Sequence, residues 1–124
     1  MNFLQHQAIY LQICDFICEN ILRGHWVEGA RIPSIRELAV SVEVNPNTVQ
    51  RSYNFLQEKE IIFNQRGLGY FVAPQSRQKT QAYLKDVFIK NDLPQVFKKM
   101  VLLGFSLRDL EPYYDAYLLE VKKN

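Results

Sequence analysis

Two closely spaced helix-start signals constrain the fold of this chain more than any other feature of its sequence. Ser34 and Glu37 match a capping box, in which each side chain accepts a hydrogen bond from the backbone N–H of the other residue. Asn45 and Pro46 match a second start, a capping residue followed by a residue suited to the first helical position. The space between the signals holds one short helix and a break at residues 43–44. The sequence therefore predicts two helices joined by a tight turn.

A longer helix is predicted before these signals, from Ala8 to Arg23. Apolar residues recur there with the spacing of one buried helix face, and Gly24 is suited to end the helix. Cys14 and Cys18 lie four positions apart on this helix, a spacing that does not favour a disulfide. We interpret both cysteines as small core residues, with a metal or redox site as the less favoured alternative. The apolar residues predicted to face the core are Ile9, Ile13, Phe16, Ile17 and Ile21.

The second of the two helices is expected to run from Pro46 to about Lys59. Its apolar positions place Val49, Tyr53 and Leu56 on the buried side. The opposite side is polar and rich in amides, with one arginine among them. The residues on this outward side are Asn47, Gln50, Arg51 and Asn54.

Two short β-prone runs follow, residues 61–64 and 70–72, joined by a glycine-rich segment with Gly67 and Gly69. Helix, helix, tight turn, helix and hairpin follow one another in the order of a winged helix-turn-helix. We therefore predict a mainly α-helical fold with a small β-wing, and place the winged helix-turn-helix domain at residues 7–75.

Residues 76–124 are predicted to form a helical tail. Helix starts are expected at Asp92, ahead of Pro94, and at Ser106, where Asp109 completes a second capping box. Because about 50 residues with apolar stripes are too few for an independent core, we expect the tail to pair two copies of the chain. The aromatic residues of the tail leave an effector pocket open as an alternative. The predicted dimerisation residues are Tyr83, Val87, Phe97, Met100, Leu110 and Tyr114.

The charge of the chain gives little guidance to its partners. The net charge is only +2. Residues 1–74 carry six basic and seven acidic side chains, whereas residues 75–124 carry nine and six. A DNA-binding function must therefore depend on the local placement of arginines rather than on bulk charge.

Several function classes find no support in the sequence. No apolar run approaches the ~20 residues that cross a bilayer, and residues 1–8 do not resemble a signal peptide, so we expect a cytoplasmic protein without a membrane partner. There is no glycine-rich phosphate loop and no cluster of cysteines and histidines. We therefore expect no enzyme, no bound metal and no cofactor. A generic protein-interaction domain is the alternative to a DNA-binding one.

The spaced motifs of the chain resemble those of the GntR family of bacterial transcription regulators, and within it the small YtrA-type subgroup. The likeness extends from about residue 9 to residue 72. The tail from Asp92 to Leu107 is also similar to that subgroup, whose short tails form a dimerisation unit. The matching positions are Gly29, residues 31–39, residues 44–51, Tyr53, Leu56, Gly67, Gly69, Phe71 and Val72.

The resemblance implies a DNA-binding protein whose helix from Pro46 enters the major groove. In relatives the arginine at the position of Arg36 contacts DNA. Amides and arginines can bond adenine and guanine edges, and an arginine beside a glycine at a wing tip suits a minor groove. The predicted DNA-binding residues are Ser34, Arg36, Asn45, Asn47, Thr48, Gln50, Arg51, Arg66 and Gly67.

The chain departs from the family pattern in two places, and each departure leads to an expectation. Many relatives have Ser/Thr-Arg at positions 45–46 and an arginine in place of Gln50, so their base preference does not transfer to this chain. Many also have glycine in place of Glu60, where a left-handed cap costs another residue roughly 1 to 2 kcal/mol, so we expect the helix to end differently here.

The sequence as a whole leads to one functional expectation. We expect a transcriptional repressor that binds a palindromic operator in double-stranded DNA as a homodimer, because two modules on two half-sites double the contacts of one. A small-molecule effector stays open.

Overall fold

The computed structural model describes residues 7–123; the first six residues, and Asn124 at the end of the predicted tail, lie outside this part. The described chain divides into two compact units, one up to Leu84 and the other from Lys85 onward. Within residues 7–123, no helix combines the length and the apolar content that crossing a membrane requires.

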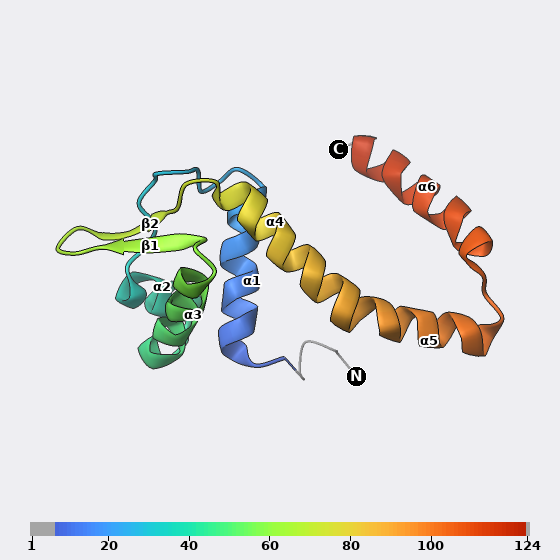
Figure 1. Cartoon of the computed structure of the whole chain (residues 1–124), viewed down its shortest axis with the longest axis horizontal. Coiled ribbons are helices and arrows are strands. Elements are labelled where there is room, and N and C mark those ends of the chain that lie inside the picture. The colour runs from blue at the N-terminus through green and yellow to red at the C-terminus, as the bar shows by residue number, and fades with distance from the viewer. Residues whose placement is uncertain (1–6, 124) are drawn as a thin grey trace. The chain divides into compact units, whose positions relative to one another are not determined.

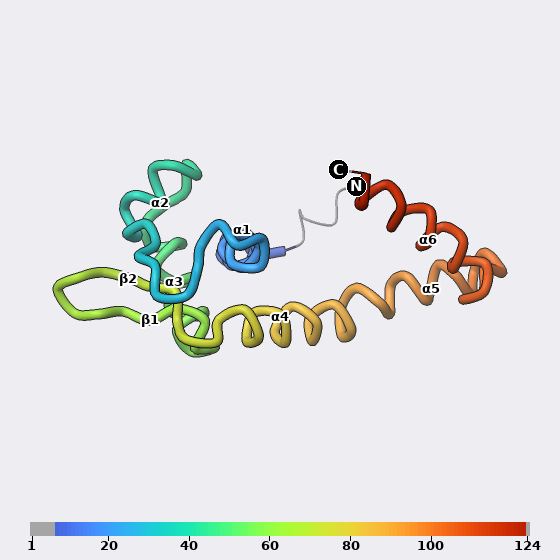
Figure 2. The backbone as a smooth tube through the Cα atoms, turned by 90° about the horizontal axis from the view of Figure 1, so that it is seen from above, coloured from blue at the N-terminus to red at the C-terminus, as the bar shows by residue number. Residues whose placement is uncertain are grey.

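The first unit combines three complete helices, the first part of a fourth and a two-stranded sheet (Figures 1 and 2). Helix α3 packs against both α1 and α2. The two strands pair antiparallel and form the predicted wing, which confirms the mainly α-helical winged fold. An isolated bridge from Arg31 to Phe71 adds a third stretch of backbone to the wing. The elements are α1 (Ile9–Leu22), α2 (Ile35–Val42), α3 (Pro46–Glu58), β1 (Ile62–Gln65), β2 (Gly69–Val72) and the first part of α4 (Ser76–Val87).

The core of this unit lies where α1, α2 and α3 meet the base of the wing. Cys14 and Cys18 are free thiols without solvent exposure, which confirms their interpretation as core residues. Burial raises the pKa of each thiol from 9.0 to about 12. The other buried residues of this core are Ile13, Ile17, Ile21, Ile32, Leu38, Ala39, Val49, Tyr53, Leu56, Ile61, Ile62 and Val72.

The predicted buried face of α1 is wrong at two positions. Ile9 is 57% exposed and Phe16 is 43% exposed. The small side chains of Cys14 and Cys18 lie at the centre of the buried face instead, and the Cys14 Sγ donates to the Ser52 carbonyl of α3 at 3.6 Å. This close approach of the two helices leaves Ile9 and Phe16 at the edges of the face.

Both helix-start signals of the first unit are confirmed. The backbone N–H of Glu37 donates to the Ser34 hydroxyl at 3.1 Å, and the N–H of Ser34 donates to the Glu37 carboxylate at 2.9 Å. The Ser34 N–H and, after it, the Ser34 side chain stabilise the Glu37 carboxylate and so hold the pKa of this carboxyl below its ordinary value. Glu43 takes a left-handed conformation at φ 55° and turns the chain towards α3. There the Asn45 side chain accepts from the N–H of Asn47 at 2.8 Å.

The expectation that the helix before Glu60 ends differently from a left-handed cap is wrong. Glu60 has a φ of 60°, in the left-handed region. Its N–H donates to the Gln57 carbonyl at 2.9 Å, and the N–H of Ile61 donates to the Leu56 carbonyl at 3.0 Å. Ile61 and Ile62 are fully buried directly after this turn. Their burial requires the sharp reversal, and the chain accepts an unfavourable backbone conformation at Glu60 to achieve it.

The second unit is helical along most of its length. After the end of α4 the chain continues through a π-helix, η2 (Phe88–Asp92), into α5 (Leu93–Leu103), and α6 (Leu107–Lys123) follows. Gly104 ends α5 with a φ of 65°. The predicted start of α6 is confirmed, because the N–H of Asp109 donates to the Ser106 hydroxyl at 3.2 Å and the N–H of Ser106 to the Asp109 carboxylate at 2.8 Å.

Helix α5 begins at Leu93, directly after Asp92 as predicted, but no break separates it from the helical turn before it. Asp92 has helical dihedrals, φ −82° and ψ −46°, and its side chain makes no capping bond. The chain stays helical here because the wider π turn directly precedes Pro94. A proline lacks an N–H and clashes with the carbonyl four residues earlier in a regular α-helix, so a locally wider turn accommodates its ring.

Candidate nucleic-acid interface

The wing, α2 and α3 lie together on one side of α1 in both views (Figures 1 and 2). Every residue predicted to bind DNA comes from these three elements or from the residues that cap their helices.

The outward face of α3 presents a pair of amides. Asn47, Gln50 and Asn54 are exposed, as the sequence predicted. The Gln50 side-chain N–H donates to the Asn54 side-chain oxygen at 3.0 Å. This bond fixes the two side chains relative to each other and leaves the Gln50 oxygen and the Asn54 amino group for further hydrogen bonds. An acceptor next to a donor is the arrangement that pairs with the edge of an adenine.

Asn54 was not among the predicted site residues. Its signal in the sequence was its position four residues after Gln50, because side chains with that spacing are neighbours on a helix surface.

The backbone N–H groups in the first turn of α3 already donate hydrogen bonds within the chain. The N–H of Asn47 donates to the Asn45 side chain, and the N–H groups of Thr48 and Val49 donate to the Asn45 carbonyl at 3.0 and 3.3 Å. Pro46 has no N–H. The predicted contact of this helix end with a phosphate therefore depends on the exposed Asn47, the half-buried Thr48 and the helix dipole rather than on free backbone donors.

Arg36 lies in the first turn of α2 and is exposed. No ion pair engages it within the described part of the chain, so its charge is available to a phosphate or a base. Ser34 is half-buried; its hydroxyl accepts the capping bond from the Glu37 N–H and also stabilises the Glu37 carboxylate. The capping box thus fixes the backbone from which Arg36 projects.

The tip of the wing carries Arg66 and Gly67, both exposed. Gly67 has a φ of 81°, and a side chain added there would meet open space, so the glycine is needed for the turn and not for packing. The situation differs at Gly69, where an added Cβ would lie 3.1 Å from the Arg31 Nε. Gly69 therefore lets the Arg31 guanidinium lie against the wing.

Arg31 was not among the predicted site residues. The structure places its charge beside the wing and near the start of α2, where it contributes to the lowered pKa of Glu37 after the two Ser34 bonds. The sequence signal was weak. Only the pairing of residues 31 and 71, which are far apart in the chain, brings Arg31 to this surface.

Arg51 differs from the other residues of α3. It is exposed, but the centre of its guanidinium lies 3.9 Å from the centre of the Tyr10 ring of α1. Its side chain therefore leans towards α1, whereas Gln50 and Asn54 bond to each other. Tyr10 was not predicted as part of the site.

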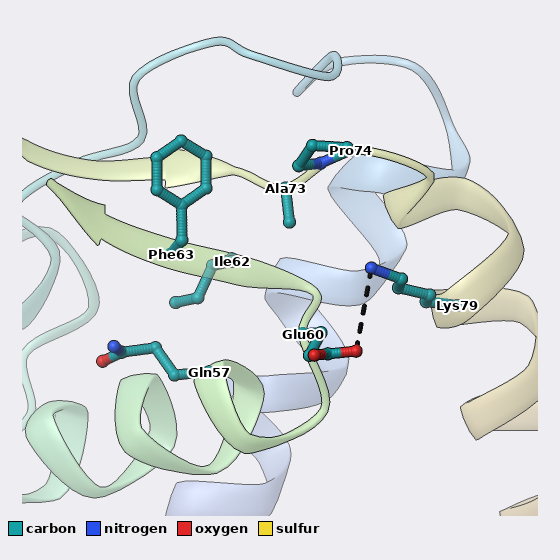
Figure 3. A pocket seen from close by; sticks show the side chains of 7 residues that line it. All are labelled: Gln57, Glu60, Ile62, Phe63, Ala73, Pro74 and Lys79. Atoms are coloured by element: carbon teal, nitrogen blue, oxygen red, sulfur yellow. Dashed lines mark ion pairs between the residues drawn. The ribbon is translucent and has the colours of Figure 1, made fainter.

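A shallow hollow of about 290 Å³ lies at the base of the wing, beside the start of α4 (Figure 3). The carboxylate of Glu60 and the Lys79 amine face each other at its edge, 4.0 Å apart. The Glu60 side chain is 78% exposed, so this ion pair contributes little to stability. The lining residues are Gln57, Glu60, Ile62, Phe63, Ala73, Pro74 and Lys79.

The predicted dimerisation residues have different environments. Tyr83 packs inside the first unit, its ring 5.6 Å from that of Phe55. Met100 is buried, and Val87 and Leu110 are half-buried. Phe97 and Tyr114 are 44% and 61% exposed. Further exposed apolar residues on α5 and α6, not named from the sequence, are Val101, Leu102, Leu103, Leu107, Tyr117 and Leu119.

Comparison with known proteins relates this geometry to one family. Residues 9–72 match the gntR family of bacterial regulatory proteins. The HTH-type transcriptional repressor YtrA of Bacillus subtilis is 32% identical over 114 residues, which cover 92% of this chain and 87% of YtrA.

Two solved structures are informative. The crystal structure of a GntR-family transcriptional regulator from Bacteroides thetaiotaomicron has a TM-score of 0.74 and 43% identity, over 94% of this chain and 100% of that one. The DNA-binding domain of AraR, solved in complex with the operator ORX1, has a TM-score of 0.53 and 25% identity, over 54% of this chain and 81% of that one. The matched family range ends with Val72, the last residue of the wing.

Proposed function

The chain belongs to the gntR family of bacterial regulatory proteins, and on that premise we propose that it represses transcription by binding a palindromic operator as a homodimer. Its helix-turn-helix domain is a DNA-binding domain of a transcriptional regulator, not an enzyme. The observation that carries the proposal is the exposed amide pair of Gln50 and Asn54 on α3, together with the exposed Arg36 on α2 and Arg66 on the wing.

Each of these groups is suited to a different part of the DNA. The α3 helix with its side chains has the width of a major groove, where the amide pair reads base edges. The wing hairpin lies beside it, and Arg66 at its tip enters the adjacent minor groove, where the negative potential attracts arginine. Arg36 and Ser34 contact the sugar-phosphate backbone and fix the register of α3.

The homodimer is supported by the apolar side chains that α5 and α6 leave exposed. Val101, Leu102 and Leu103 are 81%, 75% and 80% exposed, a run that a monomer would present to water. One winged module buries only ~600 to 1,000 Å² on DNA, so a second module adds the contacts that a genome-wide search requires. Two-fold pairing through the tail imposes a two-fold symmetric operator.

We propose repression by analogy with the relative YtrA, which is a transcriptional repressor. We also propose that the protein is located in the cytoplasm, together with its DNA. We further propose that a small-molecule effector acts through the aromatic side chains of the tail, among them the exposed Phe97 and Tyr114. The alternative, a domain that binds only other proteins, predicts no salt-dependent affinity for DNA.

The DNA part is tested by selecting duplexes from a random pool with the full chain and sequencing the bound fraction. We expect an inverted repeat. Gln50→Ala should relax the preference at one or two positions of each half-site, since one bidentate contact discriminates by about 1 to 3 kcal/mol. Arg36→Ala should weaken binding to all duplexes alike, and it should lower the slope of log affinity against log salt concentration by about 1. Enrichment of no sequence, together with affinity that salt does not change, would contradict the proposal.

The dimer part is tested by sedimentation at micromolar concentration. The full chain should sediment as a dimer, and Val101→Glu with Leu103→Glu should shift it to the monomer by placing charges in an apolar interface. Val27→Glu is the matched control, because Val27 is 57% exposed in a loop of the first unit, outside the tail. A wild-type protein that sediments only as a monomer would rule the homodimer out.

A further inference from the structure

Arg51 and Tyr10 form a stacked pair between α3 and α1 that the function proposed above does not use. The Arg51 Cζ lies 3.9 Å from the centre of the Tyr10 ring, well within the range of a cation–π contact. No ion pair engages Arg51 within residues 7–123. The guanidinium thus has an aromatic surface on one side and an unneutralised charge.

Stacking leaves the hydrogen-bonding edge of the guanidinium free. The N–H donors of arginine lie in the plane of the group, so a ring over one face does not obstruct them. They can still reach two oxygens of one phosphate at once, the geometry in which arginine binds phosphate best. The ring holds the flexible side chain in one place before DNA arrives.

The backbone beneath the pair is fixed as well. The hydroxyl of Ser52, the residue after Arg51, donates to the Tyr10 carbonyl at 2.7 Å. This bond ties α1 to α3 at the level of the stacked pair, so the ring and the arginine start from a fixed separation.

Tyr10 also packs against Phe55, which in turn packs against Tyr83. The Phe55 ring meets Tyr10 edge-on at 6.2 Å, and the Tyr83 ring meets Phe55 edge-on at 5.6 Å. Lys59 lies over both Phe55 and Tyr83, 5.6 Å from each ring centre. The series of contacts therefore runs from Arg51 through α1 and α3 to α4.

We propose that Tyr10 is a positioning residue that holds Arg51 as a clamp for one DNA phosphate beside the base-reading amides, with Phe55 and Tyr83 supporting the ring. This inference rests on the proposed function. It assigns Arg51 to the DNA backbone, because its guanidinium is drawn towards α1, while Gln50 and Asn54 keep the outward face of α3. Arg51 then contributes affinity and register without contributing base preference.

The test uses the full chain and a mixed-sequence duplex, which isolates phosphate contacts, with affinity measured by fluorescence anisotropy over a series of salt concentrations. Arg51→Ala should weaken binding about tenfold and lower the salt slope by about 1. Tyr10→Leu should weaken it about two- to fivefold, the equivalent of a surface cation–π contact. Tyr10→Phe keeps the ring and should bind like the wild type.

The double variant decides whether Tyr10 acts through Arg51. In the Arg51→Ala background, Tyr10→Leu should cause no further loss, because the group that it positions is gone. Phe16→Leu is the matched control: it also removes a ring from α1, but Phe16 packs edge-on against Trp26, and its DNA affinity should equal that of the wild type. Melting curves establish that each variant is folded at the assay temperature.

The possible failures are distinguishable. An equal loss from Tyr10→Leu with and without Arg51 would overturn the positioning role. If Arg51→Ala changes neither affinity nor slope while Arg36→Ala and Arg66→Ala lower both, the proposed function stands and this inference is wrong. If the wild type shows no salt-dependent binding at all, the proposed function itself fails.

Discussion

The hydroxyl of Tyr53 donates a 2.6 Å hydrogen bond to the carbonyl of Pro33. Tyr53 belongs to α3 and is fully buried, and burial raises the pKa of its hydroxyl. Pro33 directly precedes Ser34, with which α2 is capped. A single bond between residues far apart in sequence therefore fixes the DNA-reading helix to the point where the preceding helix begins.

Tyr53→Phe should lower the free energy of unfolding by about 1 kcal/mol. The substitution removes the hydroxyl and leaves the Pro33 carbonyl without its donor, at the usual cost of a lost internal hydrogen bond. Urea unfolding of the full chain measures the change. Tyr70→Phe is the control, because its half-buried ring lies 4.8 Å from that of Tyr53 but its hydroxyl forms no bond within residues 7–123. Equal losses from both substitutions would contradict this account.

Glu60→Gly should raise the free energy of unfolding by about 0.5 kcal/mol. The left-handed backbone at φ 60° costs a non-glycine residue roughly 1 to 2 kcal/mol, from which the extra chain entropy of glycine, about 0.5 to 1 kcal/mol, is subtracted. Thermal and urea unfolding measure the gain.

Glu60→Ala separates the backbone from the ion pair with Lys79. Alanine removes the carboxylate but keeps the Cβ, so this variant should be no more stable than the wild type. A gain in Glu60→Ala as large as that in Glu60→Gly would mean that the carboxylate, not the backbone, is the unfavourable element.

Thr80→Val should raise the free energy of unfolding by about 1 kcal/mol. The Thr80 side chain is fully buried on α4, and its hydroxyl has no hydrogen-bond partner within the described chain. Valine has the same shape without the unpaired polar group, whose burial costs about 1 to 3 kcal/mol. Urea unfolding again gives the measurement.

Ser52→Ala is the matched comparison, and it should change the free energy of unfolding in the opposite direction from Thr80→Val. The Ser52 hydroxyl is also buried but donates to the Tyr10 carbonyl at 2.7 Å and lies 3.2 Å from the Thr48 carbonyl. Its removal should lower the free energy of unfolding by about 1 kcal/mol. A loss of stability in both variants would indicate that the Thr80 hydroxyl is satisfied in solution.

Local sequence signals predicted the elements of this fold, and long-range packing decided what they missed. The capping boxes at Ser34 and Ser106 depend on residues three positions apart, so they were readable from the chain. The left-handed conformation of Glu60 could not be predicted from local sequence, because it follows from the burial of the two isoleucines after it. The start of α5 after Asp92 was predicted, but the π turn that joins it to α4 was not, since a proline signal permits such a turn as well as a break in the helix.

In the candidate site, too, features set by local sequence were predicted and features set by long-range contacts were missed. The outward face of α3 was predictable from helix periodicity, including Gln50 and its neighbour Asn54. Tyr10 and Arg31 were missed because their places depend on contacts with residues about 40 positions away, Arg51 and Phe71. No periodic pattern within one element contains that information.

The free energy of unfolding should fall as the pH rises above about 9. Burial raises the pKa of Cys14 and Cys18 from 9.0 to about 12, so the folded thiols keep protons that the unfolded thiols release. A raised pKa in the folded state means that the stability is fully present below pH 9 and is lost progressively up to pH 12. Between about pH 8 and about pH 9.5, each thiol should account for a loss of about 1 kcal/mol.

Urea unfolding of the wild type and of a Cys14→Ala/Cys18→Ala variant at the two pH values measures this loss. The variant is less stable overall, because alanine leaves space in the core, but its free energy of unfolding should change less with pH. Tyr53 and Tyr83 also have raised pKa values, and they act in the same direction only nearer pH 10, the ordinary tyrosine value. An equal drop in both proteins would show that the two thiols do not cause it, since the variant retains every other titratable group of the core.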